Sequence, residues 1–561
     1  MGKQILAAIL FTWIFSTFSP LIKSGKEIYH SSNDAKKRLY QWLTVIGFST
    51  IAVICFSKVV PFNMDEFGHY HYIICHHYKM NSLNSFRESC GGYDLNLFNS
   101  GLILPLRSYA YTGTFPSVYY YPLFLIWKDP HSARLLGMIF LIMQAFLLGK
   151  IFNINFLFFF IGLVLFFPYC FQHMVDTGPI GFQTTSIFLI YFLIDRWLTS
   201  NRIIYLLTVS FIIFLGVWTK LTYFWLMPGI LLIFIFKLLT NKIIIIKNRK
   251  KILLQLFISF SLLVALCSIL FLSTSPNNSS DRPYLSQVVN ADLYKVSDFL
   301  SGNWLGSRVI KSFINPLEAT QRIYEISPLD WISSLYIILL YFFIPFSVFI
   351  ILVKFLFLWK DINPAIIFYI AFLVTSFLII RTKASFLMHH AILAFPFLIL
   401  GVFSLVVPIL KHGSKNLSLL FKTTKIWIII FALLNLFFFF KFPNQNLWSH
   451  GENDISREEI RSVLNNNKVA EKYFYIITDW GMYYYQALYG PEIQSVLYME
   501  PLYNKNQVDS LKALSEKYSR KVLFVYNSRG PSSNLQLIHD SFSVQRCRLI
   551  KESSTWQILM E

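Results

Sequence analysis

Residues 214–229 read FLGVWTKLTYFWLMPG, and Lys220 is the only charged residue among them. Apolar sequence continues on both sides, over 203–219 before the lysine and over 221–239 after it. A helix needs about 20 apolar residues to cross a bilayer, so the stretch predicts two membrane-spanning helices joined by almost no loop. A lysine at this depth can extend its ammonium group to the lipid headgroups, but it is also suited to bind an anionic phosphate.

The composition is that of an integral membrane protein. Hydrophobic residues make up 55% of the 561-residue chain, charged residues only 14%, and the mean hydropathy is +0.52. Soluble proteins have about 25% charged residues. In a soluble chain the net charge of +20 would indicate nucleic-acid binding. Here much of the excess lies in short loops, where orientation in the bilayer explains it. The six cysteines include no CxxC pair and predict neither a disulfide framework nor a zinc ribbon.

The apolar segments predict an α-helical polytopic membrane protein with about 11–12 transmembrane helices. The first segment has an alternative interpretation as an uncleaved signal-like or interfacial segment, because no A-x-A-like cleavage site follows it cleanly. The candidate spans are 4–22, 41–60, 133–150, 153–171, 179–195, 203–219, 221–239, 252–273, 331–357, 363–380, 386–409 and 425–441.

Basic residues in the short connections predict the orientation of these spans. The positive-inside rule places basic clusters in the cytoplasm. The large regions on the other side, which we expect to be extracytoplasmic, are then 61–132, 274–330 and 442–561. The clusters comprise Lys36, Lys37 and Arg38, then Lys247, Arg249, Lys250 and Lys251, and finally Lys411, Lys415, Lys422 and Lys425.

The chain divides into three parts. Residues 1–40 hold the additional N-terminal apolar segment and a basic cytoplasmic loop, and 41–441 form the transmembrane domain. Residues 442–561 are polar and predict a small extracytoplasmic α/β domain of about 100 residues. Its predicted strands are KYFYIITD (472–479), KVLFVYN (521–527) and TWQILM (555–560), and its predicted helices are EEIRSVLNNN (458–467) and NQVDSLKALSEKYS (506–519).

Three carboxylates stand at outward ends of the predicted spans. Residues 61–72 read PFNMDEFGHYHY and place Asp65 and Glu66 directly after an apolar run. Asp176 follows at the next outward turn, in QHMVDTGPIGF. Ionisable residues at such positions are functional candidates. The alternatives are ordinary solvated loop carboxylates for the pair, and a turn or helix N-cap residue for Asp176.

Cations gather on the same predicted side. Arg381 and Lys383 lie at an outward turn in LIIRTKASFLMHHAILAFPF, and His389 and His390 follow about two helical turns later. Arg381, Lys383 and Lys220 all break the positive-inside rule in the same direction. The pattern predicts an anion-binding site near the outer headgroups.

The order of these features resembles the GT-C superfamily of polytopic glycosyltransferases. The resemblance is to the branch of protein O-mannosyltransferases and lipid A aminoarabinose transferases in particular. The pair Asp65–Glu66 ends the first functional span, the long outward loop closes with YYYPLFLIW, and the next span starts at Ala133–Arg134 in ARLLG.

The later motifs continue the resemblance, which covers 41–410. The second outward turn carries Asp176, WTK ends at Lys220, and RTKASFLMHHAILAFPF is similar to the family's basic turn and Pro-containing span. Two features depart from the family pattern: the apolar segment at 4–22 and the crowded histidines of the first loop.

The resemblance implies that 41–441 is the catalytic domain of a transferase. Its sugar donor would be a polyprenyl phosphate sugar held from the outer leaflet. Asp65 matches the position of the family's catalytic aspartate, and a carboxylate there is a suitable general base for the acceptor hydroxyl. Glu66 and Asp176 would orient the acceptor or, as the alternative, hold a divalent ion.

The physical chemistry of the transfer agrees with the cations. Phosphate leaves as an anion, so Lys220, Arg381 and Lys383 would stabilise the developing charge. A single displacement with one base inverts the anomeric centre, because retention by double displacement requires a nucleophilic carboxylate. We therefore expect an inverting hexosyl- or pentosyltransferase.

The first loop also carries the histidine-rich stretch HYHYIICHH, at 69–77. These side chains could bind zinc, although close spacing in sequence seldom gives tetrahedral geometry. The favoured alternative is contact with lipid headgroups or neighbouring residues. We expect no metal and require no cofactor. The candidate zinc ligands are His69, His71, Cys75, His76 and His77. Separately, His69, His389 and His390 are further candidates for the functional site.

Two other functions fit many spans and outward cations: a transporter or flippase of lipid-linked saccharides, and an O-antigen polymerase or ligase. A transporter places ionisable residues near the bilayer midplane, whereas here they gather at the outer boundary. The early pair Asp65–Glu66 favours a transferase over a polymerase. The expected partners are the donor lipid, membrane lipids and a lipid, glycan or protein acceptor, with no nucleic acid. We expect a multi-pass protein of the bacterial inner membrane.

Overall fold

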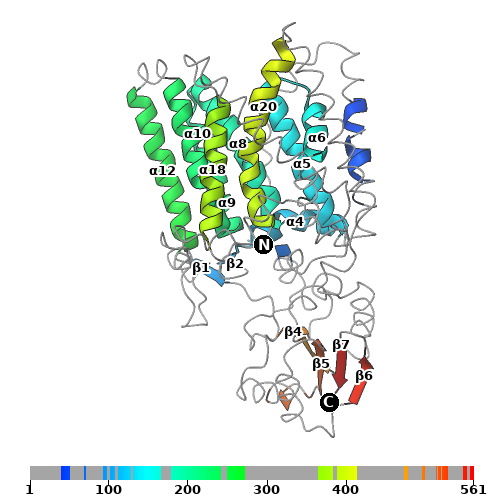
Figure 1. The fold of residues 1–561 in the computed structure, drawn as a ribbon. Helices are drawn as coiled ribbons and strands as arrows, with labels where there is room; N and C mark the ends of the chain where they lie inside the picture. The colour runs from blue at the N-terminus through cyan, green and yellow to red at the C-terminus, as the bar shows by residue number, and fades with distance from the viewer. Residues whose placement is uncertain are drawn as a thin grey trace, which may run out of the picture.

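The computed structural model contains a helical bundle and, towards the C-terminus, a five-stranded sheet (Figure 1). The predicted spans at 4–22, 331–357 and 425–441 lie outside the residues that the structure describes. The described residues are 39–43, 45–50, 53, 69–70, 93–97, 102–107, 112–127, 131–165, 173, 178–241, 249–271, 364–382, 388–412, 473–477, 496–498, 513, 516–517, 519, 521–527, 548–552 and 556–560.

Between 133 and 409, helices of the bundle coincide with those predicted spans that the structure describes. Three stretches within the described part of the chain are long and apolar enough to cross a bilayer: Ser132–Phe152, Arg249–Phe271 and Pro364–Arg381. The prediction of a polytopic helical membrane protein is thereby confirmed. The helices are α5 (His131–Phe152), α6 (Phe156–Leu165), α8 (Gly178–Ser200), α9 (Ile203–Thr219), α10 (Met227–Thr240), α12 (Arg249–Phe271), α18 (Pro364–Arg381) and α20 (Phe395–His412).

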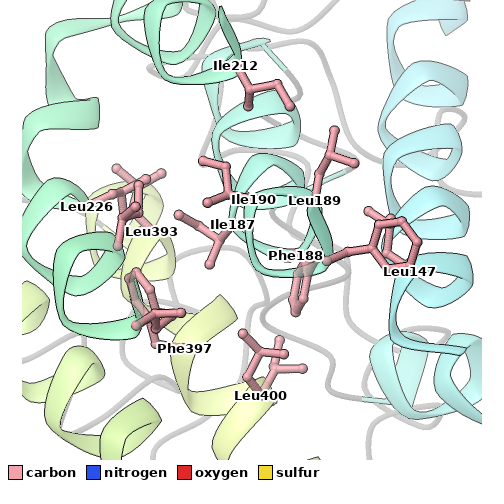
Figure 2. Close-up of a cluster of buried hydrophobic side chains, with 14 of the residues drawn as sticks. Leu147, Ile187, Phe188, Leu189, Ile190, Ile212, Leu226, Leu393, Phe397 and Leu400 are labelled. Carbon is pink, nitrogen blue, oxygen red and sulfur yellow. The ribbon is translucent and has the colours of Figure 1, made fainter. Parts of the chain in front are cut away.

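The core of the bundle surrounds α8. The four successive side chains of Ile187–Ile190 are all buried, so this helix has no solvent- or lipid-facing side at that level. A helix that is apolar all round belongs in the centre of a fold. Neighbouring helices on several sides of α8 supply the buried residues around it in Figure 2, namely Leu147, Ile212, Leu226, Leu393, Phe397 and Leu400.

Two predicted spans begin with a break. The span 221–239 starts as the 3-10 helix η2 (Leu221–Trp225) before α10. The span 386–409 starts as α19 (Met388–Ala391) and η4 (Ile392–Ala394) before α20. Proline explains both breaks. Pro228 and Pro396 stand in the first turn of α10 and α20, where a missing N–H is tolerated, but neither can extend a preceding helix.

The outward region 61–132 contains elements that the sequence did not predict. Strands β1 (Tyr93–Leu97) and β2 (Leu102–Arg107) form an antiparallel hairpin, and α4 (Phe115–Ile126) follows. They lie at one end of the bundle (Figure 1), which we call the hairpin end. Thr112, between β2 and α4, forms a β-bridge with Lys220. The end of α9 therefore also lies at the hairpin end.

The charges of the helices differ between the two ends of the bundle. Because α9 ends at the hairpin end, its first residue and the last residues of α8 and α10 lie at the opposite end. By the positive-inside rule this opposite end is the one expected to face the cytoplasm. The described Lys and Arg residues at the opposite end are Lys150, Arg196, Arg202, Lys237, Arg249, Lys250, Lys251 and Lys411.

The C-terminal sheet has the strand order β4-β3-β5-β7-β6. Strand β3 pairs in parallel with β4 and β5, and β7 pairs antiparallel with β5 and β6. Parallel neighbours need a crossover connection, as an α/β domain supplies. In Figure 1 the sheet lies beyond the hairpin end of the bundle. The strands are β3 (Tyr473–Ile477), β4 (Val496–Tyr498), β5 (Lys521–Asn527), β6 (Arg548–Glu552) and β7 (Trp556–Met560).

All three strands predicted in this domain are present. Strand β5 has the predicted bounds, and its residues Val522–Val525 are buried as expected for a central strand. Strands β4 and β6 were not predicted. The predicted helix at 458–467 lies outside the described residues, and 506–519 is described at only a few positions. The domain boundary at 442 stays a prediction.

Candidate functional site

Lys220 lies at the reversal between α9 and η2. Its backbone is extended, with φ −166° and ψ 142°, although helices precede and follow it. Its N–H donates to the carbonyl oxygen of Gly216 at 3.3 Å, and its carbonyl accepts the N–H of Tyr223 at 3.0 Å. The side chain is half-buried. The lysine predicted between two spans therefore belongs to a turn with defined backbone geometry.

Gln183 of α8 holds this turn from the core side. Its Nε2 donates to the carbonyl oxygen of Lys220 at 3.0 Å and to that of Gly216 at 3.4 Å. Its Oε1 accepts the hydroxyl of Thr222 at 3.2 Å. One turn further along α8, the hydroxyl groups of Ser186 and Tyr223 lie 2.8 Å apart. Two buried polar residues of one helix thus secure both sides of the reversal.

The loop before α4 holds the same turn from the opposite side. Gly113 donates its N–H to the carbonyl oxygen of Thr219 at 3.2 Å. A Cβ atom at position 113 would lie 1.5 Å from the carbonyl oxygen of Trp218, so only glycine fits this close approach. The indole N–H of Trp218 donates to the carbonyl oxygen of Leu106 at 2.7 Å. The end of α9 is therefore joined to the hairpin by backbone as well as by side chain.

Trp225 joins the Lys220 turn to the predicted basic turn after α18. Its indole N–H donates to the hydroxyl of Thr382 at 3.1 Å. Its ring meets the imidazole of His390 edge-on, with centroids 5.3 Å apart. Arg381 is the last residue of α18, directly before Thr382, and is half-buried. The structure thereby brings the neighbourhoods of Lys220, Arg381 and His390 together at the hairpin end.

His69 lies against the start of α8. A Cβ atom at Gly178 would lie 2.7 Å from Cδ2 of His69, so the imidazole packs directly on this glycine. The hydroxyl of Tyr119 donates to the carbonyl oxygen of Gly178. His69 stands three residues after Glu66 in the sequence, and Gly178 two residues after Asp176. The chain segments that follow the predicted carboxylates therefore meet.

Sequence reasoning assigned no role to Arg134, which is 0% exposed. It lies in the first turn of α5, two residues after Ser132, whose hydroxyl is 2.7 Å from that of Tyr120. Tyr120 packs on Tyr70 with ring centroids 4.3 Å apart. A buried guanidinium needs acceptor groups around it. One sequence feature could have identified Arg134: it stands at the start of a span on the predicted outer side, where it too breaks the positive-inside rule.

A buried polar cluster between α5 and α8 was also missed. His173 is 0% exposed, and its Nε2 lies 3.0 Å from Nε2 of Gln144 and 2.9 Å from Oγ1 of Thr184. Gln144 also donates to Oγ1 of Thr185 at 2.9 Å. Polar residues within an otherwise apolar span are the signal for such a cluster. It fixes the chain three residues before Asp176.

The remaining candidates are four residues outside the described ranges and one histidine. Asp65, Glu66, Asp176 and Lys383 lie outside the described residues, and His389 belongs to α19. Within the described ranges, no three His, Cys, Asp or Glu side chains come close enough to hold a metal ion. The candidate zinc ligands after His69, namely His71, Cys75, His76 and His77, lie outside those ranges.

The bundle, the hairpin and the C-terminal sheet together share their fold with an enzyme of the GT-C class, in agreement with the predicted architecture. In particular, the chain is similar to ArnT from Cupriavidus metallidurans, an aminoarabinose transferase of the GT-C class. Against the structure of ArnT bound to undecaprenyl phosphate, the TM-score is 0.52 at 12% identity, covering 92% of this chain and 97% of that one. Against ArnT in the apo state, the TM-score is 0.52 at 11% identity, covering 93% and 98%.

This likeness is one of fold. No protein-family model matches the sequence, and no curated protein matches it. The shared fold extends over more than nine-tenths of both chains, so it includes the bundle and the C-terminal part together. The expectation of a GT-C-type fold is confirmed at this level, and the domain division stays a prediction.

Proposed function

We propose that the protein is a membrane glycosyltransferase. It moves a sugar from a polyprenyl-phosphate-linked donor to an acceptor hydroxyl on the extracytoplasmic side, with inversion at the anomeric carbon. The observation that carries this proposal is the meeting of the Lys220 turn with the Arg381 turn and His390 around Trp225. These residues come from separate elements, and all lie at the end of the bundle that the positive-inside rule places outside.

A phosphate suits this place because it is anionic both in the donor lipid and after the sugar has left. Lys220 directly precedes η2 and Trp225 is the last of its five residues, so about 10 Å of 3-10 helix separates the two. Arg381 adjoins the residue that Trp225 contacts. Two long cationic side chains at the ends of these joined turns can converge on one phosphate. They would stabilise the charge that develops as the sugar leaves.

Asp65 is the proposed general base. A carboxylate can accept the proton of the acceptor hydroxyl as that oxygen attacks the anomeric carbon, and the phosphate departs with the bonding electrons. The packing of His69 on Gly178 supports a shared site for Asp65, Glu66 and Asp176, because short segments connect these residues to that contact. Glu66 and Asp176 orient the acceptor.

The positions of the charges favour a transferase over a transporter. In the described helices of the bundle, Asp, Glu, Lys and Arg occur only within the first two or last two turns. A transporter would hold such residues near the midplane of the bilayer. The fold neighbour that was bound to undecaprenyl phosphate supports the class of donor lipid. We place the protein in a bacterial inner membrane, with 442–561 outside.

A panel of donor lipids tests the proposal. The purified protein is incubated with polyprenyl phosphates that carry different hexoses, pentoses or aminopentoses. Sugar release or transfer is followed by mass spectrometry, with Lys220→Ala as the matched control. We expect one donor class to be consumed by the wild type and much more slowly by the variant. Failure of the folded protein to bind or consume any polyprenyl phosphate sugar would refute the proposal.

A further inference from the structure

We propose that Gln183 is a positioning residue for the donor phosphate. By holding the reversal between α9 and η2, it determines where Lys220 presents its ammonium group. This inference rests on the proposed role of Lys220 in binding the phosphate. Gln183 itself is 0% exposed and lies on α8, so it acts on the lipid only through the turn that it holds.

One amide group connects three residues of the turn. Both N–H groups of Gln183 are used, on the carbonyl oxygens of Lys220 at 3.0 Å and Gly216 at 3.4 Å. Its carbonyl oxygen accepts the hydroxyl of Thr222 at 3.2 Å. The amide thus spans the last turn of α9, the extended residue and the beginning of η2.

Such a partner matters at this place because the carbonyl groups at the end of a helix lose the regular intrahelical hydrogen bonds, and only single backbone donors, from Lys220 and Tyr223, reach the oxygens of Gly216 and Lys220 here. Lys220 leaves the helix in an extended conformation, so its carbonyl oxygen points away from the α9 hydrogen-bond ladder. That oxygen accepts the N–H of Tyr223 at 3.0 Å, and Gln183 supplies a second donor from the side of α8, also at 3.0 Å. Without it, we expect the chain to relax towards a continued helix, in which each residue turns by about 100° and the Lys220 side chain faces elsewhere.

The neighbouring contacts define what Gln183 does not do. Ser186 and Tyr223 already connect α8 to η2, and a Cβ atom at Gly216 would lie 2.4 Å from the Tyr223 ring. Packing of η2 against the core therefore remains when Gln183 is removed. The lost function is the orientation of Lys220, rather than the attachment of the turn to the bundle.

The test is a double-mutant cycle on binding of undecaprenyl phosphate to the purified protein. Gln183→Met is the main variant, because methionine fills similar space with a flexible apolar chain. We expect Gln183→Met and Lys220→Ala each to weaken binding about tenfold or more. The double variant should bind hardly more weakly than Lys220→Ala alone, because coupled residues give non-additive effects.

Gln255→Met is the matched control. Gln255 is a buried glutamine on α12 that accepts the indole N–H of Trp197 at 2.7 Å and donates to the carbonyl oxygen of Asn201 at 3.2 Å, both near the cytoplasmic end. Its replacement should lower thermal stability and leave lipid binding unchanged. If Gln255→Met and Gln183→Met weaken lipid binding equally, loss of a buried glutamine acts through general stability, and the inference is overturned.

The outcomes separate this inference from the proposed function. If Lys220→Ala binds undecaprenyl phosphate like the wild type, the phosphate site itself is wrong. If Lys220→Ala weakens binding but Gln183→Met does not, or if the two effects multiply in the double variant, only the positioning role is wrong. Should Gln183→Met not fold, Gln183→Glu replaces it, since this near-isosteric side chain keeps the acceptor for Thr222. The same non-additivity with Lys220→Ala is then required.

Discussion

Trp225 donates its indole N–H to the hydroxyl of Thr382 across 3.1 Å, although 157 positions separate the two residues in the chain. This hydrogen bond joins the α9–η2 reversal, which carries Lys220, to the end of α18, which carries Arg381. The two cations are thereby attached to one structural unit, so loss of either partner of this hydrogen bond should shift the positions of both Lys220 and Arg381.

We first predict that Trp225→Phe weakens donor lipid binding about 2–10-fold. Phenylalanine keeps an aromatic ring against His390 but lacks the N–H group, and a net hydrogen bond contributes about 0.5–1.5 kcal/mol. Thr382→Val removes the acceptor and should have the same effect. Calorimetric titration with undecaprenyl phosphate measures both. If Trp225→Phe weakens lipid binding just as much when Thr382 is already valine, this hydrogen bond is not the cause of the weaker binding.

The second prediction concerns the cations directly. Lys220→Ala, Arg381→Ala and Lys383→Ala should each weaken donor binding, because a charge-assisted contact in a partly dry site contributes about 1.5–3 kcal/mol. Lys250→Ala is the control, since Lys250 is exposed at the start of α12, at the opposite end of the bundle. If all three variants bind the donor as tightly as the control does, these cations do not bind the phosphate.

The third prediction concerns the general base. Asp65→Asn should lower the transfer rate by about 10²–10⁴ while donor binding stays nearly intact, because the shape is kept and only the proton acceptor is lost. Adjacent residues point in different directions, so Glu66→Gln should not behave in the same way. Transfer rate and donor affinity are measured together in these variants and in Asp176→Asn. Near-normal turnover in Asp65→Asn, with either of the others inactive, would identify a different base.

The fourth prediction uses two glycines. Gly113→Ala should destabilise the protein by about 1–3 kcal/mol or more, because its Cβ would lie 1.5 Å from the carbonyl oxygen of Trp218 and the loop must move. Gly47→Ala is the control: nothing lies within 4 Å of a Cβ there, and alanine favours a helix. Thermal unfolding in detergent compares them. Equal melting temperatures in the two variants would argue against a fixed contact between this loop and α9.

The fifth prediction separates the domains. Removal of 450–561 should leave donor binding intact, because the cations assigned to the phosphate all precede residue 400. Transfer to the acceptor should fall, since we propose that the C-terminal domain positions acceptor or product. Binding of undecaprenyl phosphate and sugar transfer are compared with those of the full chain. A truncated protein that is folded but cannot bind the lipid would contradict this division.

The helices were predictable because lipid demands long apolar runs. The span 203–219 has the same bounds in sequence and structure, and β5 does too. The breaks before α10 and α20 were not predicted, although Pro228 and Pro396 mark their positions in the sequence. The spans were predicted from hydropathy, and hydropathy does not show that proline interrupts a helix. Helix α4 was missed because its segment was interpreted as the closing part of a loop, and aromatic residues there gave no helical period.

Prediction of the site was limited in a different way. Lys220 and Arg381 were found because each is a charge in an unexpected place, and charge is visible in a sequence. Gln183 and Trp225 were missed because their roles depend on partners 33 to 157 positions away. Arg134 could have been found by the same charge rule, but its burial depends on packing that no local pattern reveals.

The central position of α8 has a consequence for biogenesis. The partners of Gln183 and Ser186 follow 33 to 39 positions later, on α9 and η2. At about 5–20 residues per second, the ribosome needs roughly 2–8 seconds to deliver them. A helix released alone into lipid would meanwhile expose these polar groups where water cannot solvate them. We therefore expect nascent α8 to remain next to the translocation machinery until α9 has been synthesised, and to enter the lipid together with α9 as a helical hairpin.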